Sequence, residues 1–234
     1  MLLLALSIAP GIAISLYILL MDRFNREPAR YLLACFFLGC LSILPAVIVQ
    51  LSTTRPLEQW MGTGVAYTAV FAYIIVGLSE ELSKFVVLRY YAFPKKAFDE
   101  PLDGIVYSVM VGMGFATLEN IGYVMQHGLG TAILRMFLSV PAHGTFAVLM
   151  GYFAGKAKFE PHRSRELLFK GVFWATFFHG TYDFLLFLQG NHFVNTAVGD
   201  GMLFLGAVAS FIVALILSRK AIAAHAALSK QLFR

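Results

Sequence analysis

The chain has 234 residues, of which 59% are hydrophobic and 13% are charged, with a mean hydropathy of +0.75. Soluble domains carry about 25% charged residues. The composition therefore excludes an ordinary soluble domain and predicts an all-α membrane protein that forms one polytopic domain over residues 1–234. The net charge of +5 would suggest an anionic partner in a soluble protein. Here its distribution reflects orientation in a lipid bilayer, and no nucleic-acid partner is expected.

Seven apolar segments are long enough to cross about 30 Å of hydrocarbon at about 1.5 Å per residue. We expect these spans at residues 1–21, 31–51, 64–88, 104–125, 132–154, 167–188 and 202–218, with eight spans as the alternative count. Pro45 and Pro141 predict kinks in the second and fifth spans. Gly112 and Gly114 predict close helix approach in the fourth. The basic segment 219–234 is expected to lie on the membrane surface as an amphipathic helix.

The basic residues predict how these spans are oriented. Of the 18 Lys and Arg residues, 15 follow the first, third, fifth or seventh span. Only Arg55 and Arg135 fall in the opposite loops, and Lys84 lies within a span. By the positive-inside rule the N-terminus is outside and the C-terminus is cytoplasmic.

Three charged side chains, Glu80, Glu81 and Lys84, interrupt the third span. A charge at the centre of a bilayer costs about 2.5–3.5 kcal/mol on insertion scales. Glu80 and Lys84 are spaced i,i+4, the favourable order for an ion pair on a helix, whereas Glu81 is turned about 100° away. One lysine does not obviously neutralise both carboxylates. The pattern indicates a water-filled cavity, a metal site or a proton site; the alternative is a structural Glu–Lys pair that locks helices together.

The next three spans add further polar groups at depth. The fourth span contains Glu119 and Asn120, the fifth contains His143, and the sixth contains His179 and Asp183. The i,i+4 spacing of His179 and Asp183 is the spacing with which a helix grips zinc in HExxH enzymes. Asp183 could instead orient His179, and the whole set could serve as a proton relay. The remaining histidines, which fall near helix ends or in loops, receive no role: His127, His162, His192 and His225.

Several motifs resemble the PrsW family of intramembrane proteases. They are Glu-Glu-x-x-Lys at 80–84, Phe-x-x-x-Glu-Asn at 115–120, His143 after a proline, and His-x-x-x-Asp at 179–183. The wider superfamily of CAAX prenyl proteases and Abi proteins has histidine where this chain has Glu119 and asparagine where it has Asp183. Those departures favour the PrsW branch. The resemblance covers residues of about 64–188 and implies a metal-dependent endopeptidase in a bacterial or archaeal plasma membrane. It also implies a membrane protein substrate, an anti-sigma-factor-like protein with one span.

With the resemblance in place, we interpret the site as a zinc centre for peptide hydrolysis. His143 and His179 are expected to bind the metal, with Glu119 the favoured third ligand and Asp183 either a further ligand or a partner of His179. Glu80, or alternatively Glu81, is expected to accept a proton from water. Lys84 would keep a glutamate ionised or stabilise the oxyanion. The competing hypotheses are a proton-coupled transporter and a non-catalytic membrane scaffold, and the oligomeric state stays open.

Overall fold

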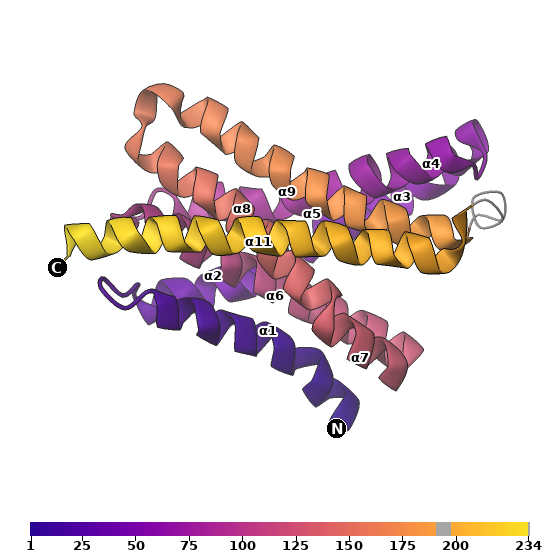
Figure 1. Ribbon diagram of the computed structural model, residues 1–234, viewed down its shortest axis with the longest axis horizontal. Helices are drawn as coiled ribbons and strands as arrows, with labels where there is room; N and C mark the ends of the chain where they lie inside the picture. Colours follow the sequence, from indigo (N-terminus) through magenta and orange to yellow (C-terminus); the bar gives the residue numbers. More distant parts are fainter. Residues whose placement is uncertain (191–197, 234) are drawn as a thin grey trace.

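The protein is described here by a computed structural model that covers residues 1–190 and 198–233. Within these residues the regular structure is helical throughout, as expected for an all-α membrane protein (Figure 1). The elements are α1 (Leu2–Met21), α2 (Ala29–Leu41), α3 (Ile43–Met61), α4 (Val65–Val70), the π-helix η1 (Phe71–Leu78), α5 (Ser79–Val87), the π-helix η2 (Leu88–Ala92), α6 (Pro101–His127), α7 (Leu129–Phe137), α8 (Ser139–Phe159), the 3₁₀ turn η3 (Pro161–Arg163), α9 (Ser164–Phe187), the 3₁₀ turn η4 (Leu188–Gly190) and α11 (Asp200–Leu232).

Helix α6 forms the centre of the bundle and packs against α1, α2, α8 and α11. Almost all of its side chains from Leu102 to Thr117 are buried. Small residues allow this packing: a Cβ added at Gly114 would lie 1.9 Å from the carbonyl oxygen of Phe36 in α2, and one at Gly112 would lie 2.8 Å from the Cβ of Ala147 in α8. The close approach predicted at these two glycines is therefore confirmed.

Proline divides two of the predicted spans. A proline has no N–H to bond the carbonyl four residues earlier, and its ring crowds that carbonyl. Accordingly α2 ends at Leu41, four residues before Pro45, and α7 ends at Phe137, four residues before Pro141. Both predicted kinks are confirmed. The second span was predicted to end at residue 51, but α3 continues to Met61. The hydroxyls of Ser52, Thr53 and Thr54 bond to carbonyls of the preceding turn in this extension.

The third predicted span is helical over residues 65–92 but contains two π-helical stretches, Phe71–Leu78 and Leu88–Ala92. The sequence pattern did not predict them. π-helical turns occur frequently at functional sites. Here the first one directly precedes the helix that carries Glu80, Glu81 and Lys84.

The C-terminal segment differs from its predicted position. Helix α11 runs without a break over 33 residues, and in Figure 1 it crosses the bundle along its long axis. The basic segment after Ser218 continues this helix instead of turning away as a separate surface helix. His225, one of the histidines that received no role, is 1% exposed, and its ring stacks on Tyr152 with centroids 4.4 Å apart. The prediction for His192 lies outside the described residues.

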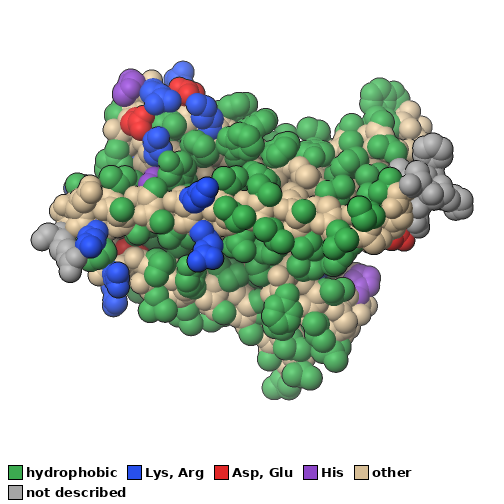
Figure 2. Space-filling view, in the orientation of Figure 1, with side chains coloured by type: hydrophobic (Ala, Val, Ile, Leu, Met, Phe, Trp, Pro, Cys, Tyr) green, Lys and Arg blue, Asp and Glu red, His purple; other side chains and the backbone are tan. Residues whose placement is uncertain are grey.

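Five helical segments of the described chain are long and apolar enough to cross a membrane: Leu2–Met21, Ala29–Met61, Pro101–His127, Leu129–Phe159 and Asp200–Leu232. The third predicted span is divided among four shorter elements, α4, η1, α5 and η2, and the sixth corresponds to α9. The count of seven spans stays a prediction. On the face shown in Figure 2, the Lys and Arg side chains gather toward the end where α11 terminates, in the sense of the predicted charge bias.

Candidate active site

Two glycines bring the π-helix η1 against α9 beside the candidate site. A Cβ added at Gly180 would lie 2.4 Å from the Tyr73 ring, and one added at Gly77 would lie 3.3 Å from the backbone nitrogen of Gly180. The Tyr73 hydroxyl also shares a hydrogen bond of 2.8 Å with the Thr181 hydroxyl. Because Gly180 directly follows His179, this contact places the start of α5 next to that histidine.

The charged residues of α5 are buried and close together. Glu80, Glu81 and Lys84 are 4%, 1% and 3% exposed. The Lys84 ammonium donates to Glu81 Oε1 at 2.7 Å and lies 3.5 Å from Glu80 Oε2. It also lies 4.1 Å from the centre of the Phe115 ring. The i,i+4 pair expected between Glu80 and Lys84 is thus present, but the shorter contact of the lysine is with Glu81.

His179 is held between the two glutamates of α5 and an aspartate of its own helix. Its Nδ1–H donates to Glu81 Oε1 at 2.8 Å. Its Nε2 lies 3.2 Å from Asp183 Oδ2 and 3.8 Å from Glu80 Oε2. Glu81 therefore fixes the orientation of the ring, and Nε2 faces two carboxylates. Asp183, considered for either role from the sequence, lies on the Nε2 side.

His143 of α8 meets Glu119 of α6 across the site. Lys84 donates to His143 Nδ1 at 3.1 Å, so Nε2 carries the ring proton and donates to Glu119 Oε2 at 3.1 Å. Glu119 is also ion-paired with Arg135 of α7. The rings of His143 and His179 meet edge to face with centroids 5.0 Å apart. All seven residues selected from the sequence are thus joined in one network of contacts.

A cavity of about 290 Å³ lies at this network, and its lining includes six ionisable site groups: Glu80, Glu119, Arg135, His143, His179 and Asp183. A second cavity of about 310 Å³ between α3 and α6 shares Glu80, Glu119 and Tyr123 with the first. The two cavities therefore adjoin each other at these residues.

The donor set fits a metal ion. Glu80, His143 and His179 each offer one ligand atom, and these atoms all lie within 4.8 Å of one another. Imidazole nitrogens and carboxylate oxygens are the ligands that zinc takes in catalytic sites. Moreover, Glu80 Oε2 is buried and has no hydrogen-bond partner within the described part of the chain, as expected for an oxygen that faces an ion or ion-bound water.

Two site residues were not selected from the sequence. Arg135 bonds to both Glu119 and Asn120, and the Gln50 side-chain amide donates to Glu80 Oε1 at 3.1 Å. Arg135 did carry a signal, since it is one of two basic residues on the side predicted to lie outside. Gln50 sits as a lone amide in an apolar run. Neither signal indicates which acid the side chain meets, because that depends on how the helices are rotated.

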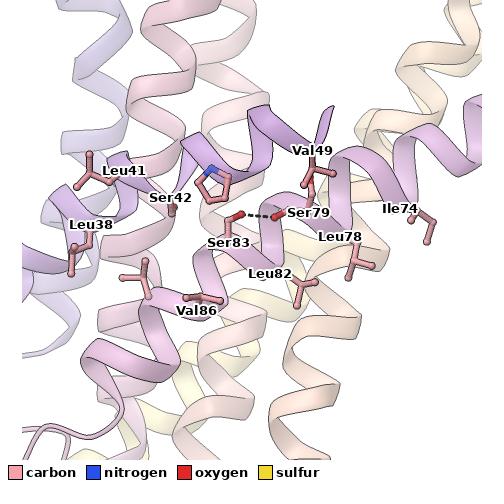
Figure 3. Close-up of a pocket in the computed structure, with 12 residues that line it drawn as sticks. Leu38, Leu41, Ser42, Val49, Ile74, Leu78, Ser79, Leu82, Ser83 and Val86 are labelled. Atoms are coloured by element: carbon pink, nitrogen blue, oxygen red, sulfur yellow. Dashed lines mark hydrogen bonds between the residues drawn. The ribbon is translucent and has the colours of Figure 1, made fainter. Parts of the chain in front are cut away.

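An apolar groove of about 620 Å³ lies apart from these residues, between the α2–α3 pair and the η1–α5 segment (Figure 3). Its only polar side chains are serines. Two of them, Ser79 and Ser83, direct their hydroxyls to backbone carbonyls one turn earlier. The groove therefore presents an apolar wall suited to lipid chains, whereas the ionisable groups line the cavity on the other side of α5.

Comparison with known proteins agrees with this geometry. Residues 27–218 match the model of the PrsW family of intramembrane metalloproteases. The chain is 39% identical to a protease PrsW of Geobacillus kaustophilus over 79% of each chain. It is 36% identical to one of Bacillus subtilis, with 79% of this chain and 82% of the relative covered. A third, from Clostridioides difficile, is 35% identical over 72% of each chain.

No solved structure matches the chain. The family match spans every element that contributes a side chain to the buried network, from α3 to α9. Members of this family are peptide hydrolases that act on membrane proteins within the bilayer, and the same holds for this protein. The apolar helices of the chain show that it is a multi-pass membrane protein. The chain belongs to the PrsW family of intramembrane metalloproteases.

Proposed function

We propose that this protein is a zinc-dependent endopeptidase whose catalytic centre is the cavity between α5, α6, α8 and α9. One observation carries the proposal: Glu80, His143 and His179, buried and contributed by three different helices, each place one ligand atom within 4.8 Å of the others. Two histidines with nearby carboxylates match the ligand sets of catalytic zinc sites.

His143 and His179 would hold the metal, and Glu119 is proposed as the third ligand. It lies beside His143 Nε2 and is anchored by Arg135. Asp183, next to His179 Nε2, is the alternative at that position. A zinc ion bound here would lower the pKa of its water to about 7 and polarise the scissile carbonyl.

Glu80 is proposed as the proton acceptor. A general base should be close to the reacting water and free of strong partners, because an ion pair makes a carboxylate a weaker base. Glu119 is ion-paired with arginine and Glu81 has the shorter bond to Lys84, whereas Glu80 Oε2 lies 3.5 Å from Lys84 and has no hydrogen-bond partner in the described structure. Glu81 is proposed to position His179, and Lys84 to keep Glu81 ionised beside it.

The proposed substrate is a membrane protein with a single span, in the manner of an anti-sigma factor, cleaved in a bacterial or archaeal plasma membrane. The resemblance of the motifs to the PrsW family supports this class. The cavity between α3 and α6 offers an extended segment a path to Glu80. All of residues 1–234 would form the one domain required, because α1 and α11 pack directly on α6.

Reconstitution tests the proposal. The full chain would be placed in vesicles with an anti-sigma-factor-like protein that carries a label at each end. We expect cleavage with zinc, none after chelation, and recovery when zinc is returned. Cleavage that survives removal of all metal would refute the zinc assignment. Cleavage of other single-span proteins but not this one would refute the substrate class.

A further inference from the structure

A second group of carboxylates lies far from the active site, at the beginning of α6. Asp22 follows α1, Glu100 precedes α6, and Asp103 lies in its first turn. All three are buried, with exposures of 1%, 0% and 0%. One ligand oxygen from each lies within 4.8 Å of the other two. Asp103 is sixteen residues before Glu119 on one helix, so the two sites are about 24 Å apart.

The aspartates of this group are fixed by backbone contacts that use only one oxygen of each. Asp22 Oδ2 accepts the N–H of Glu27 at 3.2 Å. Asp103 Oδ2 accepts the N–H groups of Asp99 and Glu100, each at 2.8 Å. The other oxygens, Oδ1 of both aspartates, are buried and have no hydrogen-bond partner among the described residues. Buried acceptors without partners are uncommon, because desolvation without a bond costs about 1–3 kcal/mol or more for a charged group.

The negative charge of the group is also not offset by a direct ion pair within the described residues. Within the described chain no lysine, arginine or histidine forms an ion pair with Asp22, Glu100 or Asp103. The nearby Lys158 instead donates to the carbonyl oxygens of Phe93 and Lys95. A fourth carboxylate, Glu27, accepts the Tyr107 hydroxyl beside them. Burial raises the pKa of the Asp22 carboxyl above its usual range, although the Glu27 N–H and the charge of Arg26 act in the opposite direction.

We propose that Asp22, Glu100 and Asp103 bind a divalent cation of the Ca²⁺ or Mg²⁺ class. These hard cations take oxygen ligands, and Ca²⁺–oxygen bonds of 2.3–2.6 Å place opposite ligands about 4.6–5.2 Å apart, which accommodates the spread of the three oxygens. The ion would join the α1–α2 connection to the first turn of α6. Since α6 carries Glu119 and packs on the helix of His143, the ion stabilises the frame of the active site without entering it.

The competing explanation is that protons neutralise the group. Wild-type, full-length protein with its active-site metal retained would be titrated with Ca²⁺, Mg²⁺ and Mn²⁺ in detergent. The effect of Ca²⁺ and Mg²⁺ would be measured as the change in Tm, and the number of bound Mn²⁺ ions would be measured by electron paramagnetic resonance. We expect one saturable site and a rise in Tm of about 5 °C or more at 100 times Kd. Protein that binds no further ion and shows no shift would overturn the proposal in favour of protons.

Variants locate the site. Asp22→Asn and Glu100→Gln keep shape and hydrogen-bond acceptors but remove charge, and each is expected to weaken Mn²⁺ binding at least tenfold. Asp99→Asn is the matched control, because the Asp99 side chain is exposed in the same connection and accepts a bond from Asn25, while the backbone N–H that Asp99 donates to Asp103 stays in place. His179→Ala should also keep the rise in Tm on addition of the cation. A shift lost in His179→Ala but kept in Asp22→Asn would place the ion in the active site and refute this assignment. If both charge-removing variants fail to fold, the wild-type titration still decides.

Discussion

Glu80→Gln separates catalysis from stability at the buried site. The amide keeps an oxygen that can accept the Gln50 hydrogen bond but cannot take a proton from water. Losing a general base lowers the rate by about 10²–10⁴-fold, which corresponds to about 2.7–5.5 kcal/mol in the activation free energy. Lys84 keeps its 2.7 Å contact with Glu81 in this variant. The fold should therefore lose little, and the bound zinc should remain.

Glu81→Gln is the matched comparison. The residue lies on the same helix, but its replacement is expected to lower stability rather than to remove the base. Glu81 is the close partner of both Lys84 and His179, so its neutralisation leaves a buried cation without its main counter-charge. Breaking a buried pair in this way costs about 3–5 kcal/mol of unfolding free energy. Turnover of a single-span reporter, thermal unfolding and zinc content would be measured for both variants in one detergent. A Glu80→Gln protein that cleaves normally, or that loses its zinc, would refute the base assignment.

Three further predictions follow from the same contacts. His143→Ala and His179→Ala should each lose zinc and activity, because a catalytic site with three protein ligands has none to spare; elemental analysis that finds stoichiometric zinc in both would remove the ligand assignment. Arg135→Gln should weaken zinc binding about 10–100-fold through loss of the anchor of Glu119. Arg55→Gln, at an exposed position of α3, should bind zinc normally, and equal affinities of the two variants would exclude the anchoring role. Reporter fusions after Gln189 and Leu232 should report opposite sides of the membrane, as seven spans require, and fusions that report one side would show that the count is wrong.

The sequence by itself determined the class of protein and most of the candidate members of the site. Charges and imidazoles are costly at membrane depth. The few that occur there therefore indicate a function, whatever the packing of the helices. Composition predicted an all-α membrane protein, and prolines at 45 and 141 predicted where two helices break, since the missing N–H is a local property of the residue. The seven candidate site residues could be selected in the same way, because each stands out against the apolar segment around it.

Only the tertiary structure decided which groups meet. The rotation and depth of each helix depend on packing such as that of Gly77 on Gly180, where backbone approaches backbone. That packing joins Lys84 more closely to Glu81 than to Glu80 and brings Arg135 to Glu119.

The second carboxylate group shows the same limit. Its members lie at positions 22, 100 and 103, in segments with ordinary interfacial charges and no unusual spacing. Burial and the pairing of each oxygen are properties of the folded chain, because they depend on side chains contributed by distant segments. Only folding brings those acids together in a buried site, where no lysine, arginine or histidine of the described chain forms an ion pair with them.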